Sequence, residues 1–261
     1  MSRLQETFAR LKSTGRPGLV TYVTAGDPDT ETSQQILVAL ARGGADVLEV
    51  GVPFSDPVAD GPVIQRASER AIAAGMTLRG SLDLVRRIRM SIDTPIVLFT
   101  YTNPVVRMDP VAFATAAAKA GVDGVLILDF PVEESEPLRA PIADAGLDPI
   151  FLISPTTTDA RIEKSNALGR GFLYLISRLG VTGVREEMAT DVEAFVSRVR
   201  RHSTLPIALG FGISKPEHVR QACKVADAAV VGSALVTVIA EHGRSGDIAG
   251  RVTDYVRWLR A

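Results

Sequence analysis

The sequence has 261 residues, of which 46% are hydrophobic and 23% charged, and its formal net charge is −1. This composition is ordinary for a globular protein, and a charge so close to zero argues against binding to nucleic acid or to an anionic membrane. The single cysteine, Cys223, excludes an intrachain disulfide. No apolar run is long enough for a transmembrane helix, and the N-terminus lacks a signal-peptide core, so we expect a cytoplasmic protein.

Eight short aliphatic runs recur along the chain, separated by segments whose apolar residues have helical spacing. The runs are continuously apolar rather than alternating, which is typical of parallel strands buried on both faces. The predicted strands are residues 19–24, 47–52, 96–101, 124–129, 150–154, 172–177, 207–211 and 228–232. Predicted helices between them include residues 32–42, 82–90, 110–120 and 192–200.

Eight strand–helix repeats in a chain of this length predict an α/β fold, a single (β/α)₈ TIM barrel, with an open doubly wound sheet as the alternative. No linker or low-complexity tract divides the chain, so we expect one domain over residues 1–261. Residues 58–79, divided by Gly75, are longer than one connection needs and predict an extra helix. Residues 178–190 form either a mobile lid or a plain surface loop. The pair Asn103-Pro104 predicts a turn.

Two carboxylates follow one another in and after the second predicted strand. Glu49 lies between Leu48 and Val50 in an otherwise apolar run, and Asp60 follows in a loop bounded by proline and glycine. Burial raises the pKa of a carboxyl group, which suits a residue that must both give and take a proton. The alternative is that Glu49 is a buried, hydrogen-bonded strut and Asp60 a turn residue.

In a barrel of this kind the site lies at the carboxyl ends of the strands, where the sequence also places Tyr101 and Asp129, with Tyr174 in the sixth strand. A Schiff-base mechanism needs a lysine there, and a metal site needs clustered ligands. The sequence indicates neither a Schiff-base lysine nor a metal site, because its lysines and histidines lie in predicted helical segments and no pair of histidines has ligand spacing. They are Lys12, Lys119, Lys164, Lys215, Lys224, His202, His218 and His242. We therefore expect no metal and no cofactor, only acid–base chemistry by carboxylates.

Glycine-rich loops after the last two predicted strands indicate a phosphorylated ligand. Residues 210–216 contain Gly210 and Gly212, and Gly232-Ser233 opens a helix. Glycines let backbone N–H groups approach an anion, and a helix N-terminus adds its positive dipole. Gly183 is a candidate third member, and the alternative is turn geometry with positive φ. An apolar pocket for a flat ring, or plain barrel core, is indicated by Tyr22, Phe211, Leu98 and Leu126.

Residues 48–65 closely resemble the signature of the tryptophan synthase alpha subunit family. Similar motifs occur along most of the chain, at residues 24–28, 101–104, 131–135, 174–178, 180–183, 210–214 and 232–233. The resemblance implies a carbon–carbon lyase that cleaves indole-3-glycerol phosphate to indole and D-glyceraldehyde 3-phosphate. It also implies that Glu49 is the acid–base group and that Asp60 accepts a hydrogen bond from the ring N–H. This sequence has Tyr22 where many relatives have Phe, and Leu128-Asp129 where Pro-Asp or Ala-Asp is usual.

The resemblance extends to substrate binding. It places Tyr174 near the reacting centre, and Thr182 and Gly183 in a closing loop. The phosphate site corresponds to Gly212, Gly232 and Ser233. The other substrate-binding candidates are Tyr22, Tyr101 and Phe211.

A partner is also implied, namely a pyridoxal-phosphate beta subunit that condenses indole with serine to L-tryptophan, in an α₂β₂ heterotetramer. The cofactor would belong to that subunit, and residues 53–57 and the loop after Tyr101 would contact it. A stand-alone lyase and a non-catalytic regulatory subunit remain open. The second would be expected to lack Glu49 or Asp60, and both are present.

Overall fold

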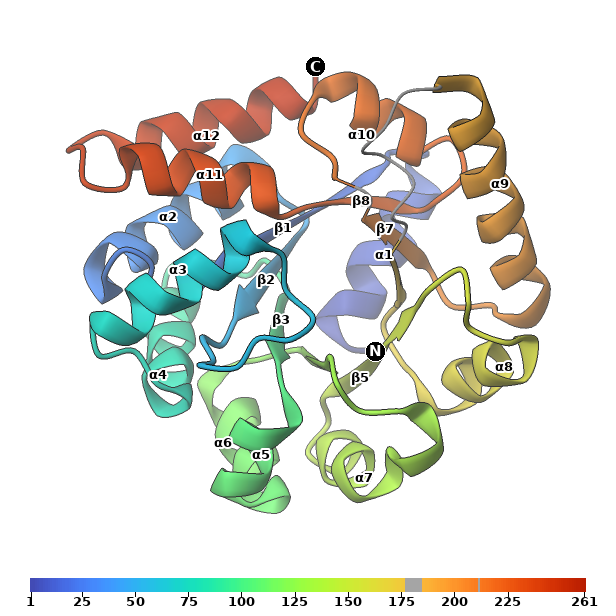
Figure 1. Cartoon of the computed structure of the whole chain (residues 1–261), viewed down its shortest axis with the longest axis horizontal. Coiled ribbons are helices and arrows are strands. Elements are labelled where there is room, and N and C mark those ends of the chain that lie inside the picture. Colours follow the sequence, from blue (N-terminus) through green and yellow to red (C-terminus); the bar gives the residue numbers. More distant parts are fainter. Residues whose placement is uncertain (177–184, 211) are drawn as a thin grey trace.

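Eight parallel strands close into a barrel in the computed structural model, which describes residues 1–176, 185–210 and 212–261, with residues 185–190 as backbone only. Each strand pairs with the next in the sequence, and β8 pairs with β1 through partners such as Leu19 and Ala229 (Figure 1). The strands are β1 Gly18–Thr24, β2 Val47–Gly51, β3 Ile96–Thr100, β4 Gly124–Ile127, β5 Asp148–Ile153, β6 Leu173–Ile176, β7 Ile207–Gly210 and β8 Ala228–Val231. Closure between β8 and β1 confirms the TIM barrel and rules out the open sheet.

Helices surround the barrel (Figure 1). In the described part of the chain they are α1 Arg3–Ser13, α2 Thr30–Gly43, α3 Pro62–Ala73, α4 Leu78–Arg89, α5 Thr102–Met108, α6 Pro110–Ala120, α7 Glu136–Asp144, α8 Asp159–Leu168, α9 Arg185–His202, α10 Pro216–Ala222, α11 Ser233–His242 and α12 Ile248–Leu259, with a 3₁₀ turn at Val132–Glu134. The predicted extra helix is α3, and it is separated from α4 by Gly75, whose φ of 86° is the left-handed conformation that glycine tolerates.

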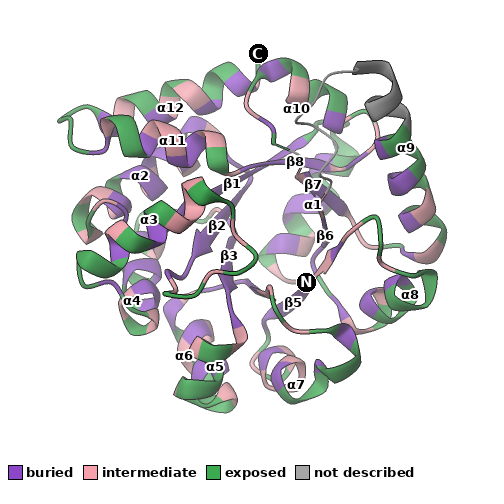
Figure 2. Cartoon of the chain, in the orientation of Figure 1, coloured by how far each residue is buried: buried purple, intermediate pink, exposed green. Residues whose placement is uncertain are grey.

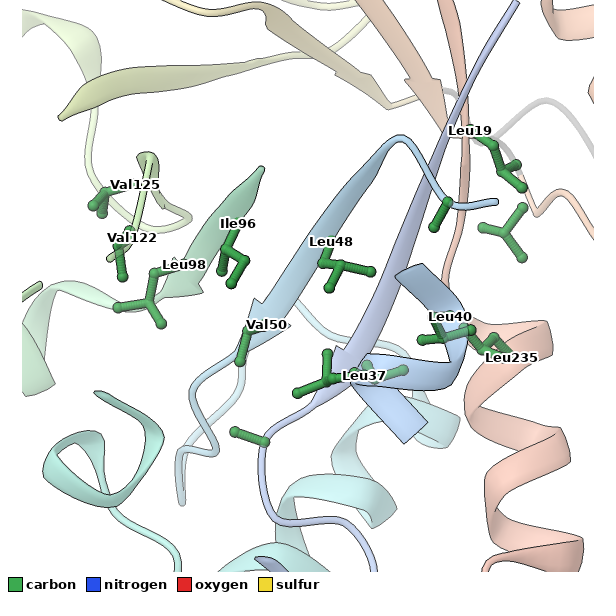
Figure 3. Packing of buried hydrophobic residues seen from close by; sticks show 14 of the residues in the cluster. Leu19, Leu37, Leu40, Leu48, Val50, Ile96, Leu98, Val122, Val125 and Leu235 are labelled. Atoms are coloured by element: carbon green, nitrogen blue, oxygen red, sulfur yellow. The ribbon is translucent and has the colours of Figure 1, made fainter. Parts of the chain in front are cut away.

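Successive strand residues point alternately into the barrel and out toward the helices. Figure 2 shows strands that are mostly buried and helices in which buried residues alternate with exposed ones. Leu48 and Leu98 face outward and belong to the same packed cluster as Leu37 and Leu40 of α2 (Figure 3). The inward residues form a second cluster, which includes Val20, Tyr22, Val47, Val97, Phe99, Leu126, Ile150, Phe172, Ala208, Ala228 and Val230.

Helix α1 closes the lower end of the barrel, where the strands begin. Its apolar side chains, Leu4, Phe8 and Leu11, are buried in the inner cluster, and the ring of Phe8 lies 5.4 Å from that of Phe172. The start of the helix is held from two strands. The hydroxyl of Ser2 donates to Asp148 at the start of β5, and Arg3 donates to Asp123, just before β4, at 2.9 Å.

Three local predictions were wrong. Strand β4 ends at Ile127, so Asp129 lies in the turn beyond it. Asn103-Pro104 lies in the first helical turn of α5 and does not form a loop. Proline is tolerated there because the N–H groups at the start of a helix have no partner within the helix. Helix α9 begins at Arg185, so part of the segment expected as a loop is helical.

Candidate active site

Glu49 lies on the inner face of β2, opposite its register partner Tyr22 on β1. Its side chain is fully buried, and neither carboxyl oxygen has a hydrogen-bond partner among the described residues. Burial raises the pKa of Glu49 from 4.5 to about 8. No described residue makes Glu49 a hydrogen-bonded strut, because such a strut would have its oxygens satisfied.

Asp60 lies in the loop between β2 and α3. Its Oδ2 accepts a hydrogen bond from the hydroxyl of Tyr101 at 3.0 Å, and its main-chain oxygen accepts one from Nε2 of Gln65 at 2.9 Å. Burial raises the pKa of Asp60 from 3.8 to about 6, although the hydrogen bond from Tyr101 acts in the opposite direction. Its N–H also donates to Pro57 at 3.0 Å, so Asp60 shapes a turn as well as offering a partly buried carboxylate.

Three aromatic side chains, those of Tyr22, Phe99 and Tyr174, pack together and form an aromatic wall on the inner side of the barrel. The ring of Phe99 lies 5.2 Å from that of Tyr22, edge to face, and 6.2 Å from that of Tyr174. Burial raises the pKa of both tyrosines, and the negative charges of Glu49 and Asp60 raise them further. These electrostatic effects mean that the tyrosines and the two carboxyl groups share one region of the barrel.

Phe99, which the sequence reasoning missed, takes the place expected for Leu98. The prediction that Leu98 lines the ring pocket was wrong by one residue, because neighbouring residues of a strand face opposite sides. Leu126 does face the interior, but it lies outside the lining of the cavity described next.

A cavity of about 310 Å³ opens beside the aromatic wall and reaches the loops after β7 and β8. It brings together most of the predicted substrate-binding residues for which positions are described. Its lining is Tyr22, Ile64, Phe99, Tyr174, Gly210, Gly212, Ile213, Ser214, Val230, Gly232, Ser233, Ala234 and Thr237. Glu49 and Asp60 are not part of this lining, but they adjoin it through the two tyrosines.

Gly212 and Gly232, one from each loop predicted to bind phosphate, have different conformations. Gly212 has a φ of 78°, so turn geometry alone accounts for glycine at this position. Gly232 has a φ of −120°, and an added Cβ would meet only the Tyr22 side chain, at 3.6 Å or more. Gly232 immediately precedes Ser233, the first residue of α11, so the start of that helix faces the cavity. A positive φ therefore does not account for glycine at position 232.

Three predicted residues, Thr182, Gly183 and Phe211, lie outside the described residues. Tyr101 is buried and contacts Asp60 rather than the cavity. Among the described residues no group of three His, Cys, Asp or Glu side chains could hold a metal. The lysine closest in sequence to the loop glycines, Lys215, is exposed and does not line the cavity.

Comparison with known proteins gives matches that span the chain. The model of the tryptophan synthase alpha chain family matches residues 8–254. The alpha chain of Burkholderia thailandensis is 48% identical over 262 residues, covering 100% of this chain and 96% of the relative. The alpha chain of Paraburkholderia phymatum is 46% identical over 261 residues, covering 100% of this chain and 96% of the relative.

Solved structures agree. The tryptophan synthase subunit alpha of Legionella pneumophila superposes with a TM-score of 0.93 at 36% identity, covering 100% of this chain and 97% of that one. A chain of the tryptophan synthase complex from Pyrococcus furiosus gives 0.84 at 37% identity, covering 93% and 97%. These matches, together with the closed barrel, show that the chain belongs to the tryptophan synthase alpha chain family.

Proposed function

We propose that Glu49 is the acid–base catalyst of this alpha chain and that Asp60 stabilises the charge that develops on the substrate ring. As an alpha chain, the protein cleaves indole-3-glycerol phosphate to indole and D-glyceraldehyde 3-phosphate, and the indole passes to a beta subunit that makes L-tryptophan from serine. The observation that carries the proposal is the fully buried carboxyl group of Glu49, which has no hydrogen-bond partner in the described part of the chain.

Cleavage needs two proton transfers that a single carboxyl group can perform in turn. Glu49, protonated at neutral pH because its pKa is about 8, first gives its proton to the ring carbon that bears the glycerol chain. The resulting carboxylate then takes the proton of the adjacent glycerol hydroxyl. As that oxygen becomes the aldehyde carbonyl, the carbon–carbon bond breaks and its electron pair returns to the ring. Indole and the aldehyde are formed, and Glu49 is again protonated.

Protonation of the ring carbon places positive charge on the ring nitrogen. We assign Asp60 to this charge, since an ionised carboxylate that accepts the ring N–H hydrogen bond stabilises the cation as it forms. The pKa of about 6 means that Asp60 is largely ionised at neutral pH while Glu49 is largely protonated. Two carboxyl groups in different environments can thus take opposite roles at one pH.

The cavity accommodates the rest of the substrate in this proposal. The indole ring lies against Tyr22, Phe99 and Tyr174, and the phosphate lies where Gly232 and Ser233 begin α11. Backbone N–H groups at a helix N-terminus suit an anion. The remaining family positions, Gly212, Thr182, Gly183 and Phe211, stay candidates for substrate contact.

We further propose that this chain binds a beta subunit in an α₂β₂ heterotetramer and that pyridoxal phosphate is held by the beta subunit alone. Residues 53–57 and the segment after Tyr101 are the proposed contacts. A cytoplasmic location is proposed as well, as expected of a biosynthetic enzyme. In the ranges that the structure describes, no helix is long and apolar enough to cross a membrane.

The test is an indole-release assay on the purified chain, with and without a beta subunit. We expect slow release by the chain alone and faster release in the complex. Full activity without the beta subunit would instead identify a stand-alone lyase. No release under either condition would contradict the catalytic proposal and favour a regulatory subunit.

A further inference from the structure

The hydroxyl of Tyr101 lies at a junction between two loops at the carboxyl ends of the strands. It accepts a hydrogen bond from the N–H of Ala59 at 3.1 Å and donates one to Oδ2 of Asp60 at 3.0 Å. One phenol oxygen therefore holds both the backbone and the carboxylate of the β2–α3 loop. Among the described residues, Tyr101 is the one side chain with a hydrogen bond to the Asp60 carboxylate.

Tyr101 is itself held firmly. It is 2% exposed, and its ring lies 5.2 Å from that of Phe54. The next residue, Thr102, donates from its N–H at 2.7 Å and from its hydroxyl at 2.8 Å to Oδ1 of Asp129. Asp129 thus fixes the backbone from which the Tyr101 ring projects. This contact gives a structural role to Asp129, a carboxylate near the site that has no part in the proposed reaction.

Among the side chains that the structure describes, no cation is paired with Asp60 in a way that could replace this contact. No described Lys, Arg or His forms an ion pair with Asp60. Among the described residues, the charge of Asp60 acts on the tyrosines Tyr22 of β1, Tyr101 after β3 and Tyr174 of β6. Glu49 acts on Tyr22 and Tyr174 as well, and Asp129 acts on Tyr101. Burial raises the pKa of Asp60, and the hydrogen bond from Tyr101 lowers it. A bond donated to a carboxylate favours its ionised form.

We propose that Tyr101 is a positioning residue that keeps the Asp60 carboxylate ionised and aimed at the substrate ring, an inference that rests on the role proposed for Asp60. Tyr101 does not line the substrate cavity, so it acts through Asp60 rather than on the substrate. Its ring and its hydroxyl have separable tasks. The ring packs against Phe54, whereas the hydroxyl makes both contacts with the loop.

The test is the pH dependence of kcat/KM for Tyr101→Phe, which keeps the ring and removes the hydroxyl. In the wild type, we expect activity to be lost on the acid side as Asp60, whose pKa is about 6, becomes protonated. Without the donated hydrogen bond the pKa of Asp60 rises, and the acid limb should move up by about one to two pH units. A uniform loss of activity with an unmoved acid limb would overturn the proposal.

Gln65→Met is the matched control, because Gln65 contacts the main-chain oxygen of Asp60 and not its carboxylate. We expect this variant to lower kcat/KM without moving the acid limb. An equal displacement of the limb in both variants would contradict the assignment to Tyr101.

A double-mutant cycle with Asp60→Asn separates this proposal from the proposed function. If Tyr101 acts through Asp60, Tyr101→Phe should have little further effect on kcat/KM in the Asp60→Asn background. Full activity of Asp60→Asn alone would refute the role of Asp60. An impaired Asp60→Asn enzyme in which Tyr101→Phe still causes its full additional loss would refute the role of Tyr101 alone.

Discussion

Tyr22 and Glu49 are register partners on β1 and β2, so their side chains enter the barrel side by side. The Tyr22 hydroxyl extends over Gly51, two residues further along β2, and occupies the space that a Cβ at Gly51 would need. A tyrosine at position 22 is thus compatible with this barrel because residue 51 has no side chain. The arrangement places a phenol ring in the lining of the 310 Å³ cavity, beside the proposed catalytic group.

Gly51→Ala should displace the Tyr22 ring and lower kcat/KM, because the new methyl group collides with the hydroxyl oxygen and two ring carbons of Tyr22. Overpacking of this kind costs about 1–3 kcal/mol in unfolding free energy. Tyr22→Phe removes the closest of these contacts but leaves ring carbons within 3.0 Å of the methyl position, so it should restore only part of the loss. Thermal unfolding and steady-state assays of the two single variants and the double variant would measure the losses of stability and of kcat/KM. An active, fully stable Gly51→Ala enzyme would contradict the fixed position of Tyr22.

The pH profile of kcat/KM should be bell-shaped. Activity should rise as Asp60 ionises near pH 6 and fall as Glu49 loses its proton near pH 8, because the proposed first step needs Asp60 ionised and Glu49 protonated. Initial rates at low substrate concentration between pH 5 and 9 would check this. A flat profile over that range would contradict the assigned protonation states.

Glu49→Gln should abolish cleavage while the fold and substrate affinity are retained. The amide has nearly the same shape but cannot give and then take a proton, and acid–base groups typically contribute about 10²–10⁴-fold. Because Glu49 would serve two transfers, we expect a loss at the upper end of that range or beyond. Single-turnover indole release and substrate binding should be measured together. Activity within a few-fold of the wild type would rule out this role.

The same variant should be more stable than the wild type at neutral pH. In the unfolded chain Glu49 loses its proton near pH 4.5, whereas in the folded protein it keeps it to about pH 8. Between these values the folded state binds more protons, so the stability of the wild type falls as the pH rises.

Denaturant unfolding of both proteins from pH 4.5 to 8 isolates this effect, since other titrating groups cancel in the difference. The unfolding free energy of Glu49→Gln relative to the wild type should grow by about 1.4 kcal/mol per pH unit. A difference that stays constant with pH would show that Glu49 is not held protonated by burial.

Gly232 tests the proposed phosphate site. An alanine Cβ fits the protein here at ordinary contact distance, so Gly232→Ala should fold normally. Gly232→Val should raise KM for the phosphorylated substrate by about tenfold or more, if its bulk keeps phosphate from the start of α11. Binding of indole, which lacks phosphate, and the melting temperature are the controls. Equal losses for both ligands would indicate distortion of the rim instead.

The barrel could be predicted because its evidence is local. Eight apolar runs, each followed by helical spacing, are visible in the sequence, and Glu49 is conspicuous as one acid within such a run. The prediction that Leu98, rather than Phe99, lines the ring pocket was wrong because the local sequence carries no signal for the inward direction. A strand buried on both faces has no alternation of polar and apolar residues, so its sequence does not reveal which residues face inward.

The contacts around Asp60 could not be predicted because they join distant parts of the chain. Tyr101 and Asp60 are 41 residues apart, and their hydrogen bond depends on how the loops after β2 and β3 meet at the rim. The role of Asp60 came from the family resemblance rather than from its loop composition. Similarly, nothing in the sequence of α5 distinguishes a short helix beginning after Tyr101 from a turn around Asn103-Pro104.

Helix α1 closes the end of the barrel where the strands begin, so only the end where the strands finish is open. Leu4 and Phe8 fill the opposite end, and Ser2 and Arg3 fasten the helix there. Substrate must therefore arrive, and both products must depart, on the side where the strands end. If Glu49 is the catalytic group, as proposed, indole formed beside it cannot leave through the end that α1 closes. We therefore expect a partner that collects the indole to dock over the open end. The N-terminal helix thus determines by which end of the barrel ligands enter and leave, although it lies at the end opposite the proposed active site.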